Sequence, residues 1–211
     1  MRTAVITICS GEEYKKIANL THPLMQKYSD KIGAEFVVLS EKNKNTTPHW
    51  LKFYLYRELL NYDKIIYLDT DIIVKDSCPS LFEIVPNEML GIFNESSIAP
   101  ERIAQFNKFM VDANLRLIQV NETYNTGVMV FDSSIINLFK LPSNKIDHIH
   151  FEQPYLNYNI HKYNIPVFKL PYKFNRMMTD DKYFEDGLIV HYAGTGGKCY
   201  DLIKKDLTNT K

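Results

Sequence analysis

The sequence shows no excess of charge of either sign. Its 25 basic and 25 acidic residues leave the chain of 211 residues without a formal net charge. This balance excludes the overall electric field that gathers nucleic acid or an anionic membrane surface, so we expect no nucleic-acid partner. A local basic pocket remains compatible with it.

The chain also has few cysteines, namely Cys9, Cys78 and Cys199. An odd number at wide spacing is typical of reduced, buried thiols in a cytosolic protein and unlike a disulfide framework. No apolar run approaches the roughly 20 residues of a membrane span. The first residues lead directly into a strand-like segment, without the charged and apolar regions of a secretory signal. We therefore expect a cytoplasmic protein with no transmembrane segment.

Repeats, low-complexity tracts and linkers are absent as well. A content of 45% apolar residues is enough to bury one sizeable core, so a single domain over residues 1–211 is expected. The polar residues 204–211 are expected to form a frayed tail or the beginning of a linker to further domains of a longer chain.

Apolar runs alternate with segments of helical periodicity, which is the pattern of an α/β domain. Strands are predicted at residues 4–9, 35–39, 64–68, 89–93, 126–131, 167–170 and 188–190, and residues 72–74 are apolar again. A helix is predicted after the first strand to about residue 28, with others at residues 48–61, 79–82, 98–114 and 151–159. The expected fold is Rossmann-like, with a mostly parallel central sheet flanked by helices.

Two acidic residues, Asp69 and Asp71, directly follow the apolar residues 65–68. A continuous apolar run is typical of a buried parallel strand, so both carboxylates are predicted at the sheet edge where open α/β folds bind ligands. Carboxylates one residue apart can both reach one divalent cation, and Mn²⁺ or Mg²⁺ suits oxygen ligands and a diphosphate. A bare Asp-x-Asp is more often structural or solvated. The apolar residues on both sides favour a metal site here, because buried unpaired charge is costly.

Five segments, taken in order, carry a resemblance to a known family. The first is the strand that runs on to Tyr14, and the others are residues 67–71, 125–127, 152–153 with 156–157, and 191–194. In this order and spacing the chain resembles the retaining glycosyltransferases of family 8, a group with the GT-A fold that includes glycogenin and bacterial lipopolysaccharide galactosyltransferases. It is also similar, in its short length and motif order, to a chlorella-virus capsid glycosyltransferase domain.

The resemblance implies a metal site made by Asp69, Asp71 and His191, with Asp69 also reaching the ribose of the donor. His191 follows the apolar residues 188–190, so it too is predicted at a strand end, and a neutral imidazole favours manganese. Without the family, such a histidine is more often a hydrogen-bonded structural group. His148 and His150 form a competing His-x-His site with Glu152, although an exposed loop is the plainer interpretation of that segment.

The same resemblance implies a binding site for a nucleotide-sugar donor. Ile8, Ser10 and Tyr14 match positions that hold uracil and ribose, with the tyrosine ring stacked on the base. Tyr14 packed as an ordinary helix residue is an equal alternative. Thr70, between the two acids, belongs to the predicted donor site. Lys52 matches, with a spacing one residue longer, a lysine near the donor sugar and phosphate, and is otherwise a solvated helix residue.

Residues 125–127 and 152–153 are predicted to face the donor sugar. Asn125 would hydrogen-bond sugar hydroxyls beside Thr126, and Gly127 would let the backbone approach a ligand closely, unless the segment is a simple turn. Glu152 and Gln153 match an Asp-Gln pair of the family. The glutamate in place of aspartate leaves the identity of the sugar open.

The loop after His191 departs from the family pattern. Gly194 is present, but Lys198 comes one residue late and the usual Pro-Trp is missing. Gly196 and Gly197 could offer backbone amides to phosphate, with Lys198 as the charge that stabilises the leaving group. A loop that closes over the donor and a plain surface loop are the alternatives.

The expected activity is metal-dependent transfer of a hexose from a UDP-sugar to an acceptor hydroxyl of a glycan, polysaccharide or glycoprotein, with retention as the resemblance implies. The expected catalytic residues are Asp69, Asp71, Glu152, Gln153 and Lys198. Because Gln153 is a poor nucleophile and Glu152 is the one nearby carboxylate, front-face attack is favoured over a covalent intermediate.

Two other functions remain open at this point. One is a nucleotide-sugar-binding domain without transfer activity. The other is a metal-dependent nucleotidyl or phosphoryl transferase, because paired aspartates serve those sites as well. A glycine-rich phosphate loop is missing for the latter, since Gly11 is the only glycine before Gly33.

Overall fold

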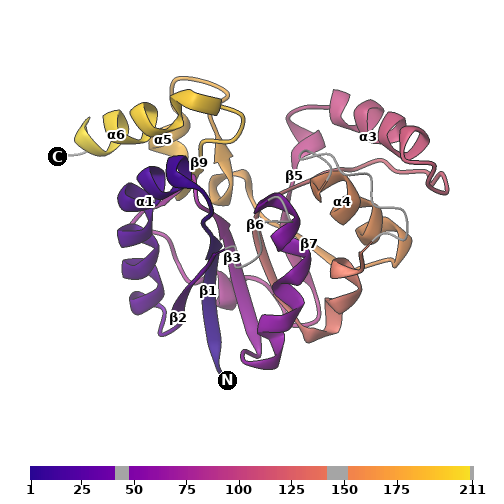
Figure 1. The fold of residues 1–211 in the computed structure, drawn as a ribbon, viewed down its shortest axis with the longest axis horizontal. Coiled ribbons are helices and arrows are strands. Elements are labelled where there is room, and N and C mark those ends of the chain that lie inside the picture. Colours follow the sequence, from indigo (N-terminus) through magenta and orange to yellow (C-terminus); the bar gives the residue numbers. More distant parts are fainter. Residues whose placement is uncertain (41–47, 142–151, 210–211) are drawn as a thin grey trace.

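A six-stranded sheet runs through the middle of the protein (Figure 1). The computed structural model describes residues 1–40, 48–141 and 152–209. The strand order is β2 (Glu35–Leu39), β1 (Thr3–Ile8), β3 (Lys64–Asp69), β6 (Tyr124–Asp132), β5 (Leu90–Asn94) and β7 (Val167–Lys169). Both pairings of β6 are antiparallel and the other three are parallel, so β6 alone runs against the rest of this sheet. The predicted α/β fold with a mostly parallel central sheet is confirmed.

A second, three-stranded sheet contains β4 (Ile72–Val74), β9 (Ile189–His191) and β8 (Arg176–Met177), in that order. β4 and β9 are antiparallel, and Ile72 lies opposite His191. The sequence predicted a strand at residues 188–190 without assigning it to a separate sheet. In this small sheet, β4 directly follows Asp69 and Asp71 in the chain and pairs with β9, which ends at His191. The pairing therefore brings His191 close to the two acids.

Helical segments cover both faces of the central sheet. They are α1 (Glu12–Lys31), η1 (Pro48–Leu60), α2 (Leu81–Ile84), η2 (Glu95–Ser97), α3 (Glu101–Asp112), η3 (Ser133–Phe139), α4 (Glu152–Lys162), η4 (Tyr172–Phe174), α5 (Tyr183–Asp186), η5 (Gly196–Lys198) and α6 (Cys199–Asn209). The η segments are 3₁₀ turns. The helix predicted over residues 48–61 is present with this tighter winding. The helix predicted over residues 98–114 begins only after Pro100, in keeping with the preference of proline for helix starts.

Alternation along the strands builds two cores. In β3, Ile65 and Tyr67 face one core, which contains Trp50 and Phe53 of η1 together with side chains of α3, η3 and α4. The intervening residues of β3 face the other core, which contains side chains of α1 and α2. Because both faces of the strand are covered, its residues 64–68 are almost entirely buried, as the continuous apolar run predicts.

The C-terminal segment is helical rather than frayed, up to Asn209. Ile203 is fully buried in a third core between α1 and the small sheet. Asp206 accepts hydrogen bonds from the hydroxyls of Tyr192, at 2.7 Å, and of Tyr183. The segment expected to be a tail therefore packs against the protein through the side chains of Ile203 and Asp206. In this position α6 lies beside α1 (Figure 1).

The three cysteines are buried and unpaired, which confirms the expectation of reduced, buried thiols. Burial raises the pKa of the Cys78 thiol to about 12. Every helix within residues 1–40, 48–141 and 152–209 is too short or too polar to cross a lipid bilayer.

Gly91 on β5 tests the packing of the sheet against α2. A Cβ atom at this position would lie 2.5 Å from Cγ2 of Val85 and 3.1 Å from Cβ of Val130. We expect Gly91→Ala to lower the free energy of unfolding by about 1–3 kcal/mol, the usual cost of overpacking a core. Urea denaturation measures this value. Gly197→Ala is the matched control, because a Cβ there meets no atom within 4 Å, and an equal loss in both variants would contradict the packing argument.

Candidate active site

Two carboxylates and one imidazole converge where the two sheets meet. Asp69 ends β3, Asp71 lies in the turn to β4, and His191 ends β9. Nε2 of His191 is 3.5 Å from Oδ1 of Asp71 and 3.8 Å from Oδ2 of Asp69. One ligand atom of each residue lies within 4.8 Å of the others. The carboxylates are 24% and 21% exposed and the imidazole is 4% exposed, so solvent reaches the cluster from the carboxylate side. Two oxygens and one ring nitrogen suit a divalent cation such as Mn²⁺ or Mg²⁺.

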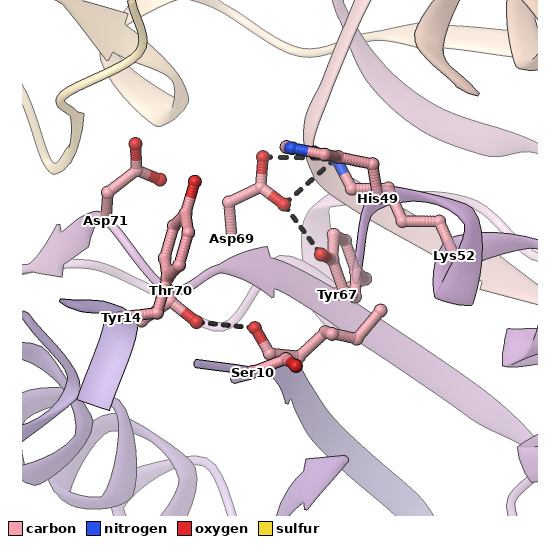
Figure 2. Close-up of a pocket in the computed structure, with 9 residues that line it drawn as sticks. Ser10, Tyr14, His49, Lys52, Tyr67, Asp69, Thr70 and Asp71 are labelled. Carbon is pink, nitrogen blue, oxygen red and sulfur yellow. Dashed lines mark hydrogen bonds and ion pairs between the residues drawn. The ribbon is translucent and has the colours of Figure 1, made fainter. Parts of the chain in front are cut away.

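Asp69 is held by two neighbours from the buried side (Figure 2). The hydroxyl of Tyr67 donates to its Oδ1 at 2.6 Å. The ammonium of Lys52 lies 2.9 Å from Oδ1 and 3.1 Å from Oδ2. Burial raises the pKa of the Asp69 carboxyl, but the charges of Lys52 and His191 and two hydrogen bonds lower it below its ordinary value. Asp69 is therefore an ionised acceptor before any cation binds.

Lys52 is buried, so the interpretation as a solvated helix residue is wrong. Its ammonium also lies 3.7 Å from Oε1 of Glu152 and 3.4 Å from Oγ1 of Thr126. Burial lowers the pKa of Lys52, but the charges of Asp69 and Glu152 raise it more, so the net shift is upward. The lysine thus remains charged. It links Asp69 to Thr126 and Glu152, two of the residues predicted to face the sugar.

Thr70 faces inward between the two acids. Its hydroxyl donates to the carbonyl oxygen of Ile8 at 2.6 Å, and its own carbonyl accepts from the hydroxyl of Thr21 at 2.7 Å. These bonds attach the turn to β1 on one side and to α1 on the other. With the middle residue held inward, Asp69 and Asp71 both face outward, as Figure 2 shows.

A pocket opens directly beside the acids. Its lining contains six of the predicted donor-binding residues and Asp71, along with two further side chains, and it lacks the predicted residues of segments 125–127, 153 and 191–198. The lining residues are Ile8, Ser10, Tyr14, His49, Lys52, Tyr67, Asp69, Thr70 and Asp71. Tyr14, on the first turn of α1, is 38% exposed. Burial raises the pKa of its phenol, and the charges of Asp71 and Asp69 raise it further. The ring lines the same pocket as Asp69 and Asp71, and its stacking on a base stays a prediction.

Gln153 is hydrogen-bonded to Thr126, which in turn accepts a hydrogen bond from Lys52. Its Oε1 accepts from the backbone N–H of Thr126 at 3.0 Å and from the Thr126 hydroxyl at 3.3 Å. Its Nε2 donates to Oε2 of Glu95 at 3.0 Å. Glu152, the preceding residue, is turned toward Lys52 and toward Nδ1 of His49 at 3.8 Å. Glu152 thus shares the ammonium of Lys52 with Asp69, and Gln153 is linked to Lys52 through Thr126.

Gly127 lies against the imidazole of His191, and Asn125 is bonded to Gly127 and to Asn175. Oδ1 of Asn125 accepts from the backbone N–H of Gly127 at 3.0 Å and from Nδ2 of Asn175 at 2.9 Å. A Cβ on Gly127 would lie 2.1 Å from Cε1 of His191, so the glycine makes room for the imidazole. The hydrogen bond from Asn125 to sugar hydroxyls stays a prediction.

Gly194 and Lys198 lie away from the lining of this pocket. Gly194 has a φ of 73°, a left-handed conformation that glycine adopts freely, and Lys198 is exposed on η5. The competing ligands His148 and His150 lie outside the described residues. Their predicted partner Glu152 is an ion-pair neighbour of Lys52.

A sequence profile described as Glycosyl transferase family 8 matches residues 6–198. The chain belongs to glycosyltransferase family 8. It is accordingly an enzyme that transfers glycosyl groups, and the resemblance found in the sequence is confirmed. Family 8 membership supports glycosyl transfer over a nucleotidyl or phosphoryl transferase. No curated protein matches the chain by sequence.

Solved structures share the fold of this family 8 chain. A glycosyltransferase involved in the glycosylation of the major capsid of PBCV-1 has a TM-score of 0.63 and 16% identity, covering 97% of this chain and 100% of that one. The galactosyltransferase LgtC, in complex with donor and acceptor sugar analogs, has a TM-score of 0.59 and 15% identity, covering 96% and 95%. Mouse xyloside xylosyltransferase 1 in its apo form has a TM-score of 0.56 and 12% identity, covering 92% and 99%. These identities show the GT-A fold alone.

Sequence reasoning missed three polar residues that contact the candidate site residues of this chain. His49 lies three positions before Lys52, and helical spacing would have placed it on the same face. Glu95 follows the predicted strand at residues 89–93, where an acid at a strand end was a usable signal. Asn175 follows no recognisable motif, and only the fold brings it to His191.

The charge balance around His191 predicts a specific pH dependence. Burial lowers the pKa of His191, but Asp71 and Asp69 raise it more, and the net shift is upward. A folded-state pKa above the unfolded value of about 6.5 means that the protonated histidine stabilises the metal-free protein below pH about 6.5. This contribution disappears as the pH rises through the folded-state pKa. The unfolding free-energy difference between the wild type and His191→Asn, measured with urea and a chelator, should therefore fall from pH 5.5 to pH 9.

His22 is the matched control for this measurement. Burial alone lowers the pKa of His22, so the unfolded chain binds more protons and the wild type gains stability as the pH rises toward 6.5. The difference between the wild type and His22→Asn should rise with pH. The same sign for both histidines would contradict the proposed charge balance.

Proposed function

We propose that this enzyme transfers a hexose from a UDP-sugar to an acceptor hydroxyl, with retention and with a divalent cation held by Asp69, Asp71 and His191. The observation that carries the proposal is the convergence of these three side chains, two of which, Asp69 and Asp71, line the pocket that contains Tyr14. Family membership supplies the reaction class, and the donor set of two carboxylates and one imidazole supports Mn²⁺ or Mg²⁺. Residues 1–211 form the catalytic domain in this proposal, alone or within a longer chain.

The pocket offers separate positions for the parts of a nucleotide. The exposed ring of Tyr14 gives a platform on which uracil stacks, next to Ile8 and Ser10. Asp69 and Asp71 lie on the side of the pocket toward His191 and, with it, would hold a cation that could contact the diphosphate. A bound cation neutralises charge that develops on the departing diphosphate. The sugar then lies toward Thr126 and Gln153, along the hydrogen bonds that start at Lys52.

The geometry of Gln153 supports attack from the front face. Its amide oxygen already accepts two hydrogen bonds from Thr126 and is therefore not free to act as a nucleophile. Glu152 is 9% exposed and is directed toward Lys52 and His49. In the proposal these residues hold the sugar in place, and the acceptor oxygen attacks on the side from which the diphosphate leaves.

The loop between Gly194 and Lys198 completes the donor site in this proposal. Gly194 and Gly196 have φ angles of 73° and 54°, left-handed conformations that glycine tolerates without strain, on either side of a right-handed Thr195. The exposed Lys198 reaches the diphosphate when this loop folds over the donor. Its ammonium then assists the departure of the leaving group.

A second pocket beyond Gln153 is suited to the acceptor. It combines aromatic rings with polar groups, as sugar-binding surfaces require: Glu95, Arg102, Gln105, Phe106, Phe109, Thr123, Gln153, Pro154 and Asn157. Gln153 is bonded to Glu95 within this pocket and connects it to the donor side through its bonds to Thr126. We assign this pocket to the acceptor, a carbohydrate or a glycoprotein glycan.

Asp71→Asn tests the metal role. Removing one ligand charge should lower both transfer and hydrolysis of the UDP-sugar on the order of 10²–10³-fold, since charge stabilisation of the leaving group is lost. A screen of nucleotide sugars with Mn²⁺ measures UDP release, and the same variant should lose the rise in melting temperature that donor binding causes by mass action. Asp76→Asn is the control, because Asp76 is an exposed carboxylate paired with Lys27. A wild-type rate in Asp71→Asn would falsify the metal role.

Arg102→Ala tests the acceptor pocket. Arg102 is 46% exposed on α3 and lies 3.3 Å from Glu95, so its loss should raise the acceptor KM about tenfold, with donor hydrolysis unchanged. Initial rates at varied acceptor concentration give this value. Glu101→Ala is the control, because Glu101 is an exposed residue next to Arg102 on α3. This variant should have the wild-type acceptor KM. Equal effects of Arg102→Ala on donor hydrolysis and on transfer would assign the pocket to the donor instead.

A further inference from the structure

The second ring nitrogen of His191 has a buried partner. Its Nδ1 lies 2.8 Å from Oδ1 of Asn175, which is fully buried between η4 and β8. The other nitrogen, Nε2, is the one that faces Asp71 and Asp69. Nδ1 therefore faces the side-chain amide of Asn175, and Nε2 faces the proposed cation site beside Asp69 and Asp71.

The direction of these hydrogen bonds follows from one backbone group. The N–H of Gly127 can only donate, and it lies 3.0 Å from the side chain of Asn125, which must present its oxygen there. The same oxygen lies 2.9 Å from Asn175, which must then present its NH₂ group to it. The amide oxygen of Asn175 consequently faces His191. An amide oxygen only accepts, so Nδ1 carries the hydrogen.

Gly127 also restricts the ring from the side. Any Cβ at this position would lie 2.1 Å from Cε1, 2.7 Å from Nδ1 and 2.9 Å from Nε2 of His191. The imidazole therefore fills the space that the missing side chain leaves. Together with the hydrogen bond at Nδ1, this contact sets the plane in which the lone pair of Nε2 points.

We infer that Asn175 is a positioning residue that holds neutral His191 as the tautomer with hydrogen on Nδ1, leaving Nε2 as the metal ligand. The inference rests on the proposed function for the identity of the ligand, but the tautomer is a property of the protein without metal. The partner of one ring nitrogen decides which nitrogen is protonated and which can bind a cation. Without the Asn175 oxygen, the hydrogen can move to Nε2 and block the ligand position.

The tautomer is measured by ¹⁵N NMR of histidine-labelled, metal-free protein, at a pH above the titration of His191. The wild type should show a protonated Nδ1 and an unprotonated Nε2. In Asn175→Ala the hydrogen should move to Nε2 in part or completely. Asn175→Asp retains an acceptor at Nδ1 and should retain the wild-type tautomer. A wild-type spectrum with the hydrogen on Nε2 overturns the inference without any variant.

Mn²⁺ affinity gives the second measurement. Asn175→Ala should bind Mn²⁺ about 10–100-fold more weakly than the wild type in calorimetric titrations, the usual effect of removing a group that orients a metal-binding histidine. Asn159→Ala is the matched control, because Asn159 is a buried asparagine whose NH₂ group donates to the carbonyls of Leu138 and Lys140 on another part of the protein. Unchanged affinity in a folded Asn175→Ala contradicts the positioning role.

The two measurements separate the inference from the proposed function. A wild type that fails to bind Mn²⁺ or Mg²⁺ while Nδ1 is protonated overturns the metal site and leaves the assignment of the tautomer intact. A wild type that binds Mn²⁺ with the hydrogen on Nε2 supports the metal site and overturns the role of Asn175.

Discussion

The short antiparallel pairing of β4 with β9 is the constraint on which the site depends. Ile72 lies opposite His191, and the backbone N–H of Tyr192 donates to the carbonyl of Asp71 at 3.1 Å. Successive side chains of a strand point to opposite faces, so a slip of one residue would turn His191 away from the acids. The cluster is therefore specified by backbone register between segments more than a hundred residues apart, while the acids themselves come from one local turn.

Charge compensation is the second requirement, and Lys52 provides it. Lys52 pairs with the carboxylates of Asp69 and Glu152, His191 lies beside Asp69 and Asp71, and His49 lies beside Glu152. Removing one member of such a set leaves uncompensated charge, which is more costly than the intact cluster. The ammonium of Lys52 therefore offsets the charge of two carboxylates. Burial raises the pKa of Asp69, but Lys52 together with His191 lowers it.

Local patterns predicted the parts of the fold that depend on short segments. The apolar residues 65–68 followed by two acids indicated a buried strand with carboxylates at its end, and β3 has this form. The same kind of apolar run in β6 could not reveal its reversed direction, because buried strands of either direction have similar composition. His191 was singled out through the family resemblance. Asn175 carried no signal, because its role depends on His191 and Asn125, which lie 16 and 50 positions away. The burial of Lys52 likewise could not be predicted locally, because its partners Asp69 and Glu152 belong to β3 and α4.

The contact of Gly127 with the His191 ring has a consequence for how such sites can change over time. Any side chain at residue 127 would overlap the imidazole, and a smaller residue at 191 would leave both an empty volume and an unused acceptor on Asn175. The two positions can therefore be replaced together but not one at a time without loss. A lineage that abandons the cation should lose the histidine and the glycine as a pair, and sequences that keep one should keep the other.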